Sequence, residues 1–130
     1  MLGLDDPDTL NTGAELGVNF AYQKQFVKAQ NVLHEMIQRA IQAKDQSAMS
    51  GAWYEIACAE AVMGKSDLAI EYLKKSNSIS PISAEWMRND KDLKSLHKDP
   101  RFAEIIAKAE QSGVAANNTH YLPQLPNRVL

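Results

Sequence analysis

The sequence predicts an all-α protein built from antiparallel helical hairpins. Apolar residues recur at helical spacing through most of residues 9 to 110. The sequence lacks the sustained alternation of apolar and polar residues that a half-buried strand needs. A pattern of small and apolar residues also returns 40 positions later, from Gly17 to Ala57 and from Ala29 to Ala69, which indicates stacked helix pairs.

The first hairpin is expected near residues 8 to 43. Its first helix should begin at Asp6-Pro7-Asp8, where an aspartate can cap and a proline fits the first turn, and should run to about Gln23. The residues expected mostly inward on this helix are Leu10, Leu16, Val18, Phe20 and Ala21. The second helix should start near Phe26 and reach about Ala43, which is roughly five turns at about 3.6 residues per turn.

The second hairpin is expected near residues 46 to 79. Asp45 is a suitable cap for its first helix, and Gly64 stands where a residue in the left-handed conformation would end that helix. Ser66 should cap the second helix, and Ser80-Pro81 should end it because proline disfavours helical backbone in the residue before it.

Shorter elements are expected after Pro81. Ser83 can cap one short helix and Asp90 or Asp92 another, and Asp99-Pro100 should open a last helix. Gly113 should end the ordered part, so residues 113 to 130, with their prolines and asparagines and no helical period, are expected to form a flexible tail.

The composition favours one soluble domain. The chain has 130 residues, of which 45% are hydrophobic and 23% charged, as is usual for a globular domain. A formal net charge of −2 gives no reason to expect a nucleic-acid or membrane surface. A single cysteine excludes an internal disulfide, and the first residues lack the features of a secretion signal, so a cytoplasmic location is expected.

The repeated pattern resembles the tetratricopeptide repeat family. The matching residues are Trp53, Ala57, Gly64, Ala69 and Pro81 in the second copy, and Leu16, Gly17, Phe20, Ala29 and Leu33 in the first. Lys24 replaces the turn glycine of the first copy, and in the second copy Glu60 replaces an aromatic residue and Ser76 an alanine. Residues 2 to 10 are similar to kinesin-light-chain-type repeats, and residues 90 to 102 to the segment that closes many tetratricopeptide arrays.

This resemblance implies a short right-handed α-solenoid with C-terminal capping helices over residues 1 to 112. Repeat 1 would cover about residues 8 to 44, repeat 2 about residues 46 to 81, and a degenerate third repeat or cap about residues 83 to 111. Two repeats bury their apolar faces only against neighbours, so the third segment should act as the missing neighbour. A homo-oligomer and the end of a longer array both stay open.

The resemblance also implies a binding surface, because the first helices of such repeats line a concave groove that holds a peptide or a partner helix. The groove candidates in this chain are Asn11, Glu15, Val18, Tyr22, Tyr54, Glu55, Cys58 and Val62. Glu15 and Glu55 occupy matching positions, so the expected partner is a protein or peptide with apolar anchors and at least one basic residue.

Catalytic chemistry is not expected. His34, His97 and His120 do not share the spacing of a helical metal pair, and Cys58 has no neighbouring histidine. We therefore predict a non-catalytic adaptor or scaffold without metal or cofactor. The alternative is a regulatory or sensor domain of a larger signalling or transcription-regulating protein, and an enzyme ranks third.

Overall fold

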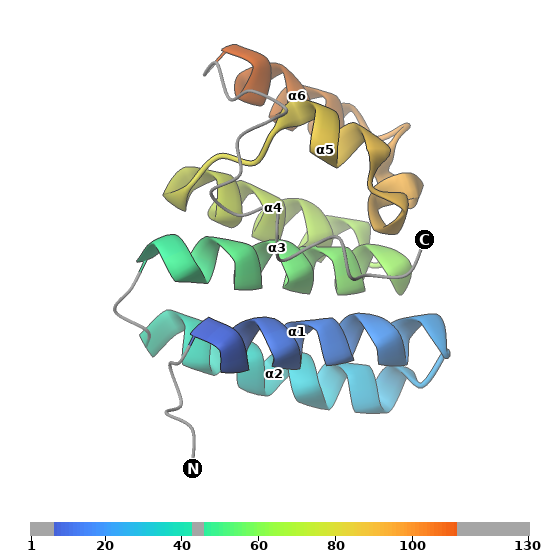
Figure 1. Ribbon diagram of the computed structural model, residues 1–130. Coiled ribbons are helices and arrows are strands. Elements are labelled where there is room, and N and C mark those ends of the chain that lie inside the picture. The colour runs from blue at the N-terminus through green and yellow to red at the C-terminus, as the bar shows by residue number, and fades with distance from the viewer. Residues whose placement is uncertain (1–6, 43–45, 112–130) are drawn as a thin grey trace.

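The computed structural model describes residues 7–42 and 46–111 (Figure 1). The elements in chain order are α1 (Pro7–Tyr22), α2 (Phe26–Gln42), α3 (Gln46–Val62), α4 (Ser66–Ile79), α5 (Ala84–Asn89), the 3₁₀ helix η1 (Lys91–Leu96) and α6 (Pro100–Gln111). This part of the chain contains helices and no strand, so the all-α prediction is confirmed. The caps expected at Asp6 and Asp45, the helix end at Gly113 and the tail to residue 130 lie outside the described residues.

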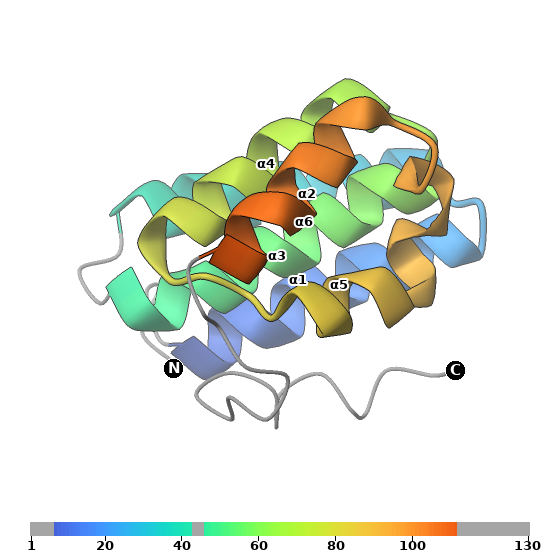
Figure 2. The same ribbon diagram turned by 90° about the horizontal axis from the view of Figure 1, so that it is seen from above.

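The helices stack in three layers (Figure 1). The pair α1 and α2 forms one layer, α3 and α4 form the next, and α5, η1 and α6 lie on the other side of that second pair. Figure 2 shows α1 and α5 along one side of the stack and α4 along the opposite side. Helix α3 lies at the centre because it packs against α1, α2, α4 and η1, and every residue from Ser50 to Ala61 is buried.

The turns inside the first two helix pairs have the same hydrogen bonds. In the first turn the amide of Lys24 donates to Ala21 and that of Gln25 to Phe20; in the second, Gly64 donates to Ala61 and Lys65 to Glu60. The central residue is left-handed in both turns, with φ of 61° at Lys24 and 81° at Gly64, which confirms the left-handed residue expected at Gly64. The local structure therefore repeats with the 40-residue shift of the sequence.

The cap expected at Ser66 is wrong. Helix α4 begins at Ser66, and Lys65 occupies the N-cap position without a side-chain hydrogen bond. The tight turn at Gly64 explains the difference, because it carries the chain into the helix one residue earlier than a serine cap would.

Small residues allow the helices of each pair to approach closely. A side-chain carbon added at Gly17 would lie 2.6 Å from Leu33 Cδ2, which is too close for any residue but glycine without a shift. Ala57 and Ala69, which stand 40 positions after Gly17 and Ala29, are fully buried in the second hairpin. Leu16, expected inward, is instead 44% exposed, because α1 lies in an outer layer of the stack, whereas Ile56, 40 positions later, belongs to the central helix α3 and is fully buried.

The third layer begins with a broken helix. Ser83 caps α5 by accepting from the amide of Trp86, as expected. Helix α5 ends at Asn89, Asp90 has extended backbone with φ −78° and ψ 114°, and η1 follows directly. Asp90 rather than Asp92 caps η1, since its carboxylate accepts from the amide of Asp92. This break turns the two aspartates toward α3.

Candidate functional site

The groove candidates on α1 form a stripe with different exposures. Glu15, Val18 and Tyr22 follow one another at helical spacing, so their side chains lie on one side of α1. Glu15 is half-buried, Val18 is fully buried and Tyr22 is 45% exposed. Asn11 belongs to α1, but its side chain lies outside the described residues.

The groove candidates on α3 are more deeply covered. Tyr54, Glu55 and Cys58 are buried, and Val62 is half-buried at the end of the helix. The cover includes η1, which packs against α3. The structure therefore leaves Glu15, Tyr22 and Val62 as the accessible candidates, while the three central residues of α3 form the floor beneath.

Four hydrogen bonds fasten Asp90 and η1 to α1 and α3. The hydroxyl of Tyr22 on α1 donates to the carboxylate of Asp92, and the hydroxyl of Tyr54 on α3 donates to Asp90 Oδ2 at 2.7 Å. The thiol of Cys58 approaches the same Asp90 oxygen at 3.9 Å, and the hydroxyl of Ser95 donates to the backbone oxygen of Ala61 at 3.0 Å. We call Tyr22, Tyr54, Cys58, Asp90 and Asp92 the polar clasp.

The polar clasp places two carboxyl groups in a poorly solvated environment. Burial raises the pKa of Asp92 to about 6, although the hydrogen bond from Tyr22 opposes this shift. Burial also raises the pKa of Asp90, against hydrogen bonds from Tyr54 and from the amide of Asp92. The pKa of Cys58 is raised well above its usual value by burial and by the nearby aspartates. The two carboxyl groups therefore keep a proton to higher pH than ordinary aspartates do, and the thiol ionises less readily than an exposed one.

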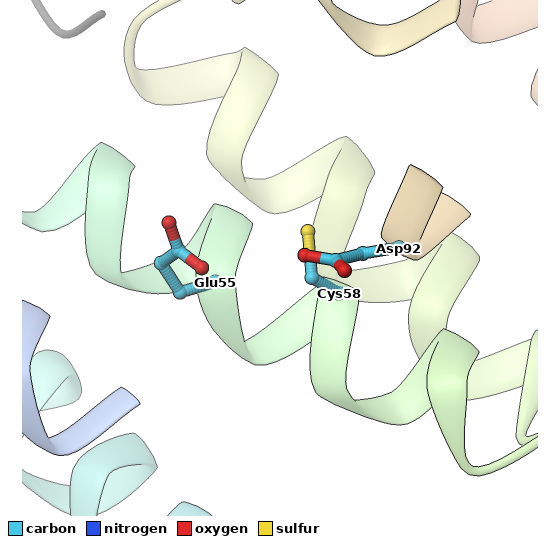
Figure 3. A group of neighbouring side chains, drawn as sticks. All are labelled: Glu55, Cys58 and Asp92. Carbon is cyan, nitrogen blue, oxygen red and sulfur yellow. The ribbon is translucent and has the colours of Figure 1, made fainter. Parts of the chain in front are cut away.

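Glu55 lies beside this cluster. Figure 3 shows Glu55, Cys58 and Asp92 together, and one polar atom of each lies within 4.8 Å of the others. Thiol and carboxylate groups are ligand types that Zn²⁺ accepts, but a thiol binds a metal as the thiolate. In this structure Asp92 accepts from Tyr22 and the Cys58 thiol contacts Asp90, so the group is held as a hydrogen-bonded polar cluster.

The large apolar side chains that the described residues expose gather on the first helix pair. They are Leu16, Tyr22, Phe26, Val27 and Ile41. A separate cavity of about 350 Å³ lies between α4 and α6, where Ile105 and Ala109 supply apolar walls and Lys74, Lys108 and Glu104 line it with charges. Local sequence patterns do not predict this cavity, because its walls come from two helices, α4 and α6, that come together only in the folded chain.

Comparisons with protein-family models, with curated proteins and with solved structures find no match to this chain. None of the described helices has both the length and the apolar character needed to cross a bilayer.

Proposed function

We propose that this chain is a non-catalytic protein–protein interaction module of the tetratricopeptide repeat kind, an adaptor or scaffold of the cytoplasm. Its partner would be an extended peptide or a helix lying along the concave side of α1 and α3. Two observations support this repeat assignment. The turns at Lys24 and at Gly64 have the same hydrogen bonds, and small residues, Gly17 and the buried Ala69, stand where the helices of each pair approach closely.

The observation that carries the proposal is the exposure of Tyr22. This aromatic side chain is 45% exposed at the border between α1 and η1, on the same side of α1 as Glu15 and above the buried Val18. Aromatic residues of this kind are the usual anchors of protein interfaces, because they bury a large area with few rotatable bonds. A partner with an apolar anchor against Tyr22 and a basic residue near Glu15 fits this edge.

The proposal is tested by binding kinetics with a purified partner, first identified by a pull-down. Tyr22→Ala should speed dissociation about 5- to 30-fold, the range expected when an anchor contributing about 1 to 2 kcal/mol is removed. Tyr22→Phe keeps the ring and loses only the hydroxyl that donates to Asp92, so its dissociation should differ from the parent's by no more than a few-fold. Val27→Ala removes a side chain that is 75% exposed on α2 and provides the matched control.

Charge reversal provides the second arm of this test. Glu15→Lys should slow association and weaken its dependence on salt, because a rim charge mainly steers the encounter. Glu71→Lys makes the same change at an exposed position of α4 and should leave association unchanged. If Tyr22→Ala and Glu15→Lys both bind like the parent, the edge of α1 is not the binding site.

A further inference from the structure

The segment from Asp90 to Leu96 covers the part of the groove that the sequence assigned to partner binding. The break after α5 turns it onto α3, and its short 3₁₀ turns are held by bonds such as Leu93 N to Asp90 O at 3.0 Å. Its apolar side chains, Leu93 and Leu96, are fully buried. Tyr54 and Cys58 of α3 lie beneath its start, so these groove residues cannot meet a partner while the segment is closed.

The contacts of this segment differ in their response to protons. Leu93 and Leu96 hold the segment equally at any pH. The contacts of Asp90 and Asp92 depend on pH, because these carboxyl groups can ionise and are buried, with 9% and 2% of their surface exposed. The ionisable groups that face the two aspartates are Tyr22 from α1, Tyr54, Glu55 and Cys58 from α3, and Lys91 from η1 itself. Lys91 is the cation among them, and its ammonium group lies 5.4 Å from the centre of the Tyr22 ring.

We propose that Asp90–Leu96 is a proton-controlled gate over the groove, closing on α3 when Asp92 is protonated and opening more often when Asp92 is ionised. Opening would release the bonds of Tyr22 and Tyr54 to the aspartates and uncover Tyr54, Glu55 and Cys58. As regulation of a binding groove, the inference rests on the function proposed above. The movement of the segment itself does not depend on any partner.

The direction of the effect follows from the two states of Asp92. In the closed state its pKa is about 6, and in the open state it returns to the ordinary value of about 3.9. Because the pKa of Asp92 is higher in the closed state, binding a proton stabilises that state. This stabilisation is complete below about pH 3.9 and is lost as the pH rises through about 6. The ratio of open to closed protein should therefore rise roughly 10- to 100-fold between pH 4 and pH 7 and then level off.

Cys58 reports opening directly, because it is the only cysteine of the chain and is fully buried in the closed state. Its labelling by dipyridyl disulfide would be followed from pH 4 to pH 8 in the full chain without partner. Each rate would be divided by the rate of the urea-unfolded chain at the same pH, which removes the reactivity change of the thiol itself. Asp92→Asn is the test variant, and Asp67→Asn, at an exposed carboxylate of α4, is the control.

In the parent and in Asp67→Asn, the normalised rate should rise roughly 10- to 100-fold over this range. In Asp92→Asn it should rise less, because the contribution of Asp92 is gone and Asp90 is the buried aspartate of the segment that still titrates. A parent rate that stays flat or falls with pH would overturn the gate, and so would an unchanged slope in Asp92→Asn.

The variant Tyr22→Phe and hydrogen exchange distinguish local opening of the segment from global unfolding. Tyr22→Phe removes one clasp hydrogen bond and should increase labelling a few-fold at every pH, about the effect of one such bond. Hydrogen exchange should show faster exchange at Leu93 and Leu96 than at Leu73 of α4. Equal exchange at all three would mean that Cys58 reacts only through global unfolding and would refute a local gate. Because these readouts need no partner, a failed gate and a failed binding site are distinguishable.

Discussion

The two matched turns predict opposite effects of substitution at Lys24 and Gly64. Both residues are left-handed, with φ of 61° and 81°, and both lie in the same hydrogen-bonded turn. In this conformation a residue with a side chain lowers the free energy of unfolding by about 1 to 2 kcal/mol, whereas glycine does not. However, glycine also lowers the free energy of unfolding, by about 0.4 to 1 kcal/mol, because it gives the unfolded chain a larger entropy.

The difference between these terms gives the expected magnitude. Lys24→Gly should stabilise the chain by about 0.5 to 1 kcal/mol, and Gly64→Ala should destabilise it by a similar amount. For a domain of this size, each change corresponds to about 2 to 5 °C in the melting temperature. An added carbon at Gly64 would meet no atom within 4 Å, so backbone strain alone should cause the loss.

Both variants would be unfolded by heat and by urea and followed by circular dichroism at the helix signal. The double variant should return close to the stability of the parent, since the two turns belong to different helix pairs and a carbon added at Gly64 meets no atom within 4 Å, so their effects should add. Shifts of the same sign, or no shift in either variant, would refute the argument that one turn structure serves both helix pairs.

Three further predictions concern packing and the C-terminal residues. Ala69→Leu should cost on the order of 1 to 3 kcal/mol, because Ala69 is fully buried where α3 and α4 pack; an unchanged melting temperature would contradict this packing. Ser76→Ala should cost about 0.5 to 1.5 kcal/mol by urea unfolding, since the Ser76 hydroxyl donates to the buried backbone oxygen of Ser50 at 2.8 Å; an unaltered urea midpoint would mean that this bond contributes nothing. Deleting residues 114–130 should leave the melting temperature and the oligomer size nearly unchanged, and a loss of several degrees would show that the helices depend on this segment.

The helices could be predicted from the sequence because their signals are local. Apolar spacing located the four long helices, and Gly64 and Pro81 marked the end of α3 and the region after α4. The outward position of Leu16 could not be predicted, because helical spacing shows that a residue is on an apolar face but not whether a neighbour covers that face.

Local sequence patterns also could not predict that η1 covers the candidate site. Tyr54 and Cys58 were interpreted as open groove residues, and their burial depends on Asp90, which follows them by 36 and 32 residues. The sequence indicated only that Asp90 or Asp92 caps a short helix. It did not indicate that the helix before it breaks and turns both carboxyl groups toward α3.

The dissociation rate of the Tyr22→Ala variant from a purified partner, measured beside Tyr22→Phe and Val27→Ala, tests the proposed interaction module most directly. We predict dissociation about 5- to 30-fold faster for Tyr22→Ala, a change of no more than a few-fold for Tyr22→Phe, and the rate of the parent for Val27→Ala. Equal rates for all three variants, or a larger effect of Val27→Ala, would contradict partner binding at the edge of α1 that carries Tyr22.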